Sequence, residues 1–141
     1  MKPLAYIYPV TAFVIFLQGI TGASTVLNFY DVGSHLASGY VTGVFALADL
    51  VIAFIAKPKS IALRYSSLVL FILVVIQGML GFAAMTSDQI VAAHFTNFLV
   101  LFGVSIATIF YAFRWGRGVG GMVEKKTAQG QTTTTTTTAT A

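Results

Sequence analysis

Charged residues are scarce in this chain. Asp, Glu, Lys and Arg make up 9% of its 141 residues, whereas hydrophobic residues make up 57%. Soluble domains carry about 25% charged residues, so this chain has too few charges to cover a surface that faces water. Its formal net charge of +4 comes from basic residues at the ends of apolar runs, where membrane proteins place them. The pattern argues against nucleic-acid binding and predicts the lipid bilayer as the partner.

Cysteine is missing altogether. This absence excludes disulfides, thiolate metal sites and thioether attachment of haem. A bound metal or haem must therefore use histidine, methionine or oxygen ligands. The chain has two histidines, His35 and His94, and they become the first residues to consider as ligands.

Long apolar runs are what the sequence does contain. Each of four runs has close to the ~20 residues that a helix needs to cross a bilayer. None alternates as a β-strand does, and unbroken runs of this length span membranes as helices. We therefore expect an all-α integral membrane protein, a bundle of four transmembrane helices within residues 1–115. The predicted spans are Leu4–Gly22, His35–Ala56, Tyr65–Met85 and Ile90–Phe113.

The basic residues predict the orientation of this bundle. Apart from Lys2, they follow the second run or the fourth: Lys57, Lys59, Arg64, Arg114, Arg117, Lys125 and Lys126. The connections after the first and third runs hold no Lys or Arg. The positive-inside rule then places both termini in the cytoplasm of a multi-pass protein of the cell membrane.

Two segments fall outside the predicted spans. The segment Ala23–Ser34 is too long for a tight turn and too apolar for a free loop, so we expect a short helix lying at the membrane interface. Residues 116–141 are rich first in glycine and then in threonine and alanine. Such a segment cannot bury enough apolar area to order itself, which predicts a flexible cytoplasmic tail.

The two halves of the apolar region repeat each other. The matched pairs are Gln18 with Gln77, Gly19 with Gly78, Gly22 with Gly81, and His35 with His94, and each pair is 59 residues apart (94 − 35 = 59). Glutamine and histidine are rare in lipid, so these matches are not a by-product of composition. We predict two repeated helical hairpins, at about residues 10–56 and 69–115, related by an axis near the membrane normal.

This relation places the two histidines at equal depth on opposite sides of an axis. The helix faces that carry them are formed mainly of small and polar residues, namely Ser38, Gly39, Thr42, Ala46, Asp49 and Ala53 with His35, and Asn97, Leu101, Ser105, Thr108 and Ala112 with His94. A planar haem takes one axial imidazole on each side, and helix bundles build such sites. We expect a non-covalent b-type haem with His35 and His94 as iron ligands and with Gly39, Thr42 and Asn97 beside it. The competing interpretation is that both histidines only form hydrogen bonds at the headgroup level.

Three further polar residues leave alternatives open. Gln18 and Gln77 lie near the depth of the histidines, where they support a bound cofactor or join helices by hydrogen bonds. Asp49 lies ~21 Å deeper along the helix than His35. It takes up a proton there or stays protonated in lipid.

A run of Gln-Gly-x-x-Gly late in one helix, followed by a loop and then a histidine at the top of the next helix, occurs twice. This pattern, spread over Val10–Phe113, resembles one half of heme A synthase. That family has eight helices in two four-helix halves, each with a histidine pair on its second and fourth helices. The resemblance implies a half-size member with His35 and His94 as haem ligands, and a homodimer that rebuilds eight helices. It also implies oxidation of a haem methyl group to a formyl group.

One position departs from that family. Its catalytic half has a glutamate three residues before the first histidine, where this chain has Val32, and Val91 in the second repeat. The nearest carboxylate is Asp31, which becomes the candidate catalytic residue. Besides haem oxidation, two functions stay open: a b-type cytochrome subunit that passes electrons within a respiratory membrane complex, and a cofactor-free accessory or scaffold subunit.

Overall fold

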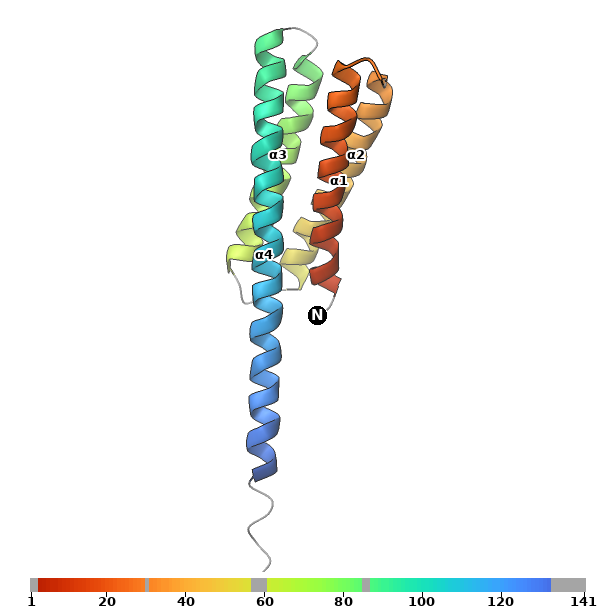
Figure 1. Ribbon diagram of the computed structural model, residues 1–141. Helices are drawn as coiled ribbons and strands as arrows, with labels where there is room; N and C mark the ends of the chain where they lie inside the picture. Colours follow the sequence, from red (N-terminus) through yellow and green to blue (C-terminus); the bar gives the residue numbers. More distant parts are fainter. Residues whose placement is uncertain (1–2, 30, 57–60, 85–86, 133–141) are drawn as a thin grey trace, which may run out of the picture.

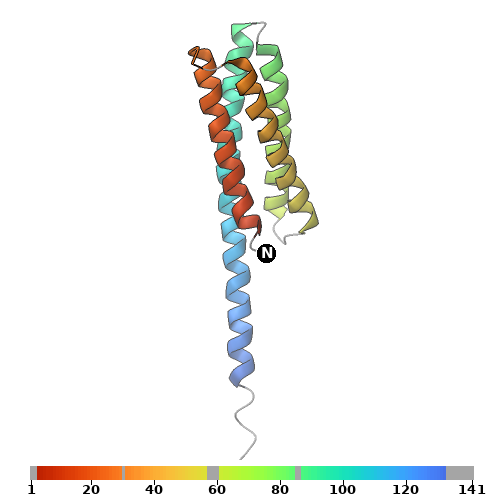
Figure 2. The ribbon, with the colours of Figure 1, turned by 90° about the vertical axis from the view of Figure 1, so that its right-hand side faces the viewer.

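The chain folds into four helices that run alternately up and down. The computed structural model describes residues 3–29, 31–56, 61–84 and 87–132, with side chains from 6 to 114 within these ranges. The helices are α1 (Pro3–Val26), α2 (Val32–Ile55), α3 (Ile61–Ala83) and α4 (Asp88–Thr132). Each packs against its two neighbours in the ring α1–α2–α3–α4, so that α1 faces α3, and α2 faces α4, across the diagonals. Figure 1 and Figure 2 show this bundle, with α4 projecting far past the end that holds the N-terminus.

All four helices are long and apolar enough to cross a membrane. The candidate spans are Tyr6–Val26, Val32–Ile55, Ile61–Ala83 and Asp88–Arg114. Large apolar side chains cover the outside, and Val44 and Phe110 are 68% and 70% exposed. Polar side chains such as Thr42 and Asp49 are buried instead. Because lipid favours apolar groups on the outside, the chain is a four-span, multi-pass membrane protein, as the sequence predicted.

The connection between α1 and α2 differs from the prediction. Instead of a separate interfacial helix over Ala23–Ser34, the described residues continue α1 to Val26 and begin α2 at Val32. Asn28 adopts a positive φ of 61°, and the amides of Asn28 and Phe29 donate to the last carbonyls of α1. This left-handed termination is favoured by glycine and, next, asparagine. The interfacial helix was therefore a wrong prediction, because a capped helix end takes up the extra residues.

The far end of α4 also differs from expectation. Composition predicts a flexible tail from residue 116, yet α4 continues to Thr132. Residues 122–129 include several good helix formers, and a helix that is already nucleated extends at little cost. The flexibility of the tail stays a prediction. Residues 133–141, and the loop lysines Lys57 and Lys59, lie outside the described residues.

The inward faces of α2 and α4 are the ones that the sequence predicted. The buried residues of α2 are Thr42, Ala46, Asp49 and Ala53, and those of α4 are Leu101, Ser105, Thr108 and Ala112. Each α4 residue follows its α2 counterpart by the same offset of 59 (101 − 42 = 59). An apolar cluster of Ile15, Ala46, Leu70, Val74 and Leu101 fills the middle of the bundle. It forms the floor beneath the histidines.

Candidate functional site

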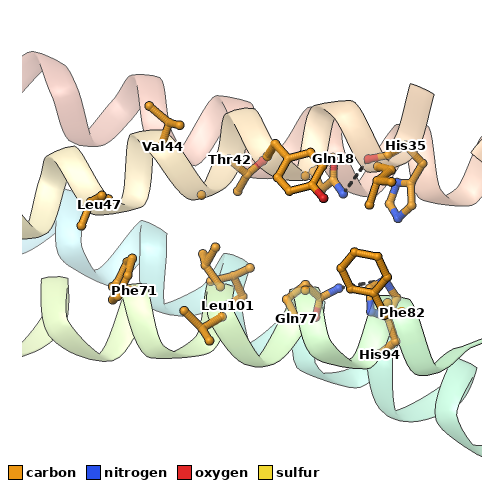
Figure 3. A pocket seen from close by; sticks show the side chains of 18 of the residues that line it. Gln18, His35, Thr42, Val44, Leu47, Phe71, Gln77, Phe82, His94 and Leu101 are labelled. Atoms are coloured by element: carbon orange, nitrogen blue, oxygen red, sulfur yellow. Dashed lines mark hydrogen bonds between the residues drawn. The ribbon is translucent and has the colours of Figure 1, made fainter. Parts of the chain in front are cut away.

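The two histidines meet inside the bundle, at the end away from the N-terminus. His35 lies in the first turn of α2, and His94 lies in the second turn of α4. Although these helices are diagonal to each other, the two ring centroids are 6.1 Å apart and the ring planes are at 86°. Figure 3 shows both rings pointing into the space between the helices. Both side chains are half-buried.

This spacing is that of two ligands to one metal ion. An ion bonded to one nitrogen of each ring at ~2 Å would set the ring centroids about 6 Å apart. The observed distance between the ring centroids, 6.1 Å, matches this separation. Among the described residues, no three His, Cys, Asp or Glu side chains are grouped so as to hold an ion by themselves.

In the first hairpin, polar side chains of α1 and α2 orient His35. The hydroxyl of Thr21 donates to the carbonyl of Gln18 (3.0 Å) and lies 3.3 Å from Nδ1 of His35. In the tautomer where the Thr21 proton stays on the Gln18 carbonyl, Thr21 accepts from Nδ1–H and the lone pair of the ring lies on Nε2. The Gln18 amide donates to the His35 carbonyl (3.2 Å), and its oxygen accepts from Ser38. The Nε2 atom of His35 is thus prepared as a ligand.

In the second hairpin the corresponding contacts differ. Asn97 donates to Oε1 of Gln77 (2.6 Å), which turns the Gln77 amide nitrogen toward Nε2 of His94 at 3.1 Å. Because the Gln77 nitrogen can only donate, Nε2 accepts and the proton of the ring lies on Nδ1. That Nδ1 is buried and has no hydrogen-bond partner among the described residues. Leu80 occupies the position equivalent to Thr21 (80 − 21 = 59), so this hairpin lacks the corresponding hydroxyl.

Both imidazoles lie against a glycine of the preceding helix. A Cβ built on Gly22 would lie 2.9 Å from Cε1 of His35, and one built on Gly81 would lie 3.2 Å from Cε1 of His94. Real Cβ atoms essentially never approach as closely as 2.9 Å, and 3.2 Å is tighter than nine in ten real Cβ contacts. Gly22 and Gly81, the second glycines of the repeated motif, thus let each ring enter the bundle interior.

Two cavities adjoin the histidines, on opposite faces of the bundle. The larger, of about 520 Å³, lies mainly between α2 and α3, and the smaller, of about 240 Å³, lies mainly between α1 and α4. Both are lined by His35, His94, Gln18 and Gln77. The larger cavity lies within the ~300–1,000 Å³ typical of sites for small molecules and cofactors. Figure 3 shows its lining, which runs from the histidines to apolar side chains of α2 and α3.

The other predicted site residues divide into two groups. Gly39 and Thr42 line the larger cavity, and Asn97 holds Gln77, so these three lie with the histidines. Asp31 does not line either cavity. Its carboxylate is exposed and accepts from the amide (2.9 Å) and hydroxyl (2.7 Å) of Ser34, so it caps the N-terminus of α2.

Two residues beside the histidines, Thr21 and Phe98, were not predicted from the sequence. Thr21 lies one turn after Gln18 on the same face of α1, a spacing at which two side chains act together, and this was the signal available. Phe98 on α4 covers Gly19 of α1, since a Cβ on that glycine would run into the phenyl ring. Phe98 is one of 12 phenylalanines in the chain, so its residue type alone gave no signal of this contact.

Asp49 lies deeper in the bundle and apart from this group. It is fully buried, and neither carboxyl oxygen meets strict hydrogen-bond geometry with a described residue, although the Thr11 hydroxyl lies close enough to interact with the carboxyl. Its polar neighbours are Thr11 and Tyr8 of α1. Tyr8 itself crosses the bundle to Ser67 of α3 at 3.1 Å. The two hydroxyls of that pair stand at positions that are again 59 residues apart.

Comparison with known proteins gives no match from which a function could be inferred. No protein family model matches the chain, and no curated protein or solved structure matches it. The case for a function therefore rests on the paired imidazoles, the polar contacts that orient them, and the cavity beside them.

Proposed function

We propose that this protein binds one b-type haem non-covalently inside the membrane, with His35 and His94 as its axial ligands. The observation that carries the proposal is the meeting of two imidazoles from diagonal helices at a spacing of 6.1 Å. A porphyrin supplies the in-plane nitrogens itself, so two axial imidazoles complete its iron. The apolar cavity beside the rings provides space of the right kind for the macrocycle.

The residues of the chain have separate parts in this site. Thr21 holds the Nδ1 side of His35 and directs Nε2 inward. The Gln77 amide occupies the lone pair of His94 Nε2, which is the same lone pair that iron needs, so this hydrogen bond has to open when haem binds. Gly22 and Gly81 leave room for the imidazoles themselves to turn into the bundle interior. Lipid and the large apolar side chains of the outer surface exclude water.

Electron transfer is the role that these contacts favour. Bound haem supplies a one-electron redox centre. Imidazoles on both faces leave no axial position open for oxygen, and the carboxylate of Asp31 is engaged at the helix cap. We therefore propose a b-type cytochrome function within a membrane complex, with both termini in the cytoplasm.

The second candidate is haem oxidation, in the manner of heme A synthase. It is favoured by the repeated glutamine, glycine and histidine positions that carry the resemblance to that family. We infer for the same reason that the bundle is a duplicated hairpin and that two chains associate as a homodimer. Extraction of the pigment separates the candidates: unmodified haem b favours electron transfer, and hydroxylated or formylated haem favours oxidation.

The deciding experiment is an absorption spectrum of the full chain in detergent, oxidised and reduced. We expect a Soret band and sharp reduced bands typical of two axial histidines. His35→Ala or His94→Ala should remove them. Thr96→Ala is the matched control, because Thr96 is exposed on the same helix as His94 and bonds only its own helix among the contacts described. A wild-type chain that shows no Soret band and takes up no added haemin would refute the proposal and favour a scaffold role.

A further inference from the structure

The two cavities beside the histidines differ in size although they occupy equivalent faces of the bundle. The α2–α3 cavity measures about 520 Å³ and the α1–α4 cavity about 240 Å³. If the bundle is a duplicated hairpin, the repeat maps α2 onto α4 and α3 onto α1, so one cavity maps onto the other. Two cavities of equal volume are then expected, and the difference in volume requires residues at which the two repeats differ.

The clearest break in the repeat lies at one pair of positions beside the cavities. Gly39 on α2 is equivalent to Phe98 on α4 (98 − 39 = 59). The ring of Phe98 lies directly on Gly19, whereas a Cβ built on Gly78, which is equivalent to Gly19, meets nothing within 4 Å. The same phenylalanine is held in place by Phe102, with stacked rings 6.3 Å apart, and by Phe95 at 6.4 Å. The α1–α4 face is therefore filled by a fixed aromatic ring, and the α2–α3 face is left open.

We propose that Gly39 and Phe98 together decide the side from which the haem macrocycle enters the bundle, namely the α2–α3 side. This inference rests on the proposed haem site. The open cavity is lined by apolar side chains that also face lipid, including Tyr40, Val44 and Phe82. A flat apolar ligand dissolved in the bilayer can pass between α2 and α3 to reach both histidines, and Phe98 prevents the same approach between α4 and α1.

The test exchanges the two side chains. In the full chain in detergent, Gly39→Phe places a ring over Gly78 as Phe98 lies over Gly19, and it should lower haemin affinity about tenfold or more. A Cβ on Gly39 also lies 3.2 Å from the Gln18 amide nitrogen, so this variant shifts Gln18 as well, whereas a Cβ on Gly78 meets nothing within 4 Å. The double variant Gly39→Phe with Phe98→Gly opens the opposite face and should recover most of the lost affinity. Gly103→Phe is the matched control, because Gly103 on α4 is exposed, has open space around it and lines neither cavity. It should bind haemin as the wild type does.

A second variant that narrows the same cavity keeps the test decisive if Gly39→Phe does not fold. Gly78 has open space around it, so Gly78→Leu narrows the α2–α3 cavity without a clash and should also weaken and slow haemin uptake. Phe98→Ala alone should keep full binding. If Gly39→Phe and Gly78→Leu bind haemin as the wild type does, the side assignment is wrong while the haem site stands. If the wild type itself binds no haemin, the haem proposal fails, and this inference falls with it.

Discussion

The two hairpins of this bundle share their packing but differ in the side chains that surround their histidine. Glycine lies against the imidazole in both, and the buried positions of α2 and α4 correspond one to one. The differing pairs are Thr21 with Leu80, Gly39 with Phe98, and Asp49 with Thr108. The shared residues set how closely the helices approach, and the differing ones set the hydrogen bonding, access and charge of each side. The comparison shows that two repeated hairpins with the same packing can form a site whose two sides differ.

The largest effect should follow from filling the shared glycines. Gly22→Val and Gly81→Val each force a side chain into an imidazole, and overpacking of this kind costs about 1–3 kcal/mol. Since the Cβ distance is shorter at Gly22 than at Gly81 (2.9 against 3.2 Å), the first hairpin should lose more. Haemin titration and thermal unfolding would measure the loss. Gly103→Val is the control, and equal losses at all three glycines would contradict a role specific to the histidines.

Exchanging the partners of the imidazoles should have the next largest effect. Thr21→Leu removes the acceptor beside Nδ1 of His35, and loss of such support typically costs about 10–100-fold in metal affinity. Leu80→Thr offers a hydroxyl to the unpartnered Nδ1 of His94 and should strengthen binding. Haemin dissociation constants of the two variants measure this. If both changes weakened binding equally, the difference between the hairpins would have no bearing on the site.

An effect of the opposite sign is expected deeper in the bundle, where the Asp49 carboxyl has no well-formed hydrogen bond among the described residues and Thr108 has one. Asp49→Thr makes the halves alike, because a threonine hydroxyl can donate to its own helix as Thr108 does to Val104 at 2.9 Å. Relieving a buried unpartnered polar group should add about 1–3 kcal/mol to the free energy of unfolding. Unfolding in detergent mixtures, followed by circular dichroism, would measure it. A loss of stability would show instead that the carboxyl has a function in the folded protein.

The smallest effect concerns the helix starts, which also differ between the hairpins. The hydroxyl and then the amide of Ser34 hold the pKa of the Asp31 carboxyl below its usual value. A lowered folded-state pKa means that the cap stabilises above the ordinary pKa and that this contribution is lost as pH falls through the lowered value. Asp31→Ala should therefore reduce thermal stability slightly at neutral pH and not in acid, as melting curves would show.

The matched change at the start of α4 is Ser87→Ala, since the Ser87 hydroxyl accepts from Ile90 at 3.4 Å. A hydroxyl does not titrate in this range, so its effect should be independent of pH. The haem spectrum should be unchanged in Asp31→Ala. A spectrum or turnover that depended on Asp31 would contradict its role as a cap and restore it as the catalytic carboxylate.

Much of the fold could be read from the residues themselves. Runs of apolar residues predicted the spans because lipid leaves a chain no other way to satisfy its backbone. Helical periodicity placed Thr42, Asp49 and Thr108 on inward faces, where they are buried. The end of α1 was misjudged, because a termination through Asn28 depends on backbone conformation, which composition does not reveal. The catalytic role of Asp31 was predicted from its nearness in sequence to His35 and stays a prediction; the structure shows its carboxylate capping α2.

The sequence by itself determined that the chain crosses the membrane as helices and that each half carries one histidine at a matching position, because hydropathy and spacing act along the chain. Only the tertiary structure decided that the rings meet at 6.1 Å, that one imidazole is held by Thr21 and the other by Gln77, and that Phe98 fills one face. These outcomes depend on which side chains from different helices compete for the same space, and that competition exists only once the helices have packed.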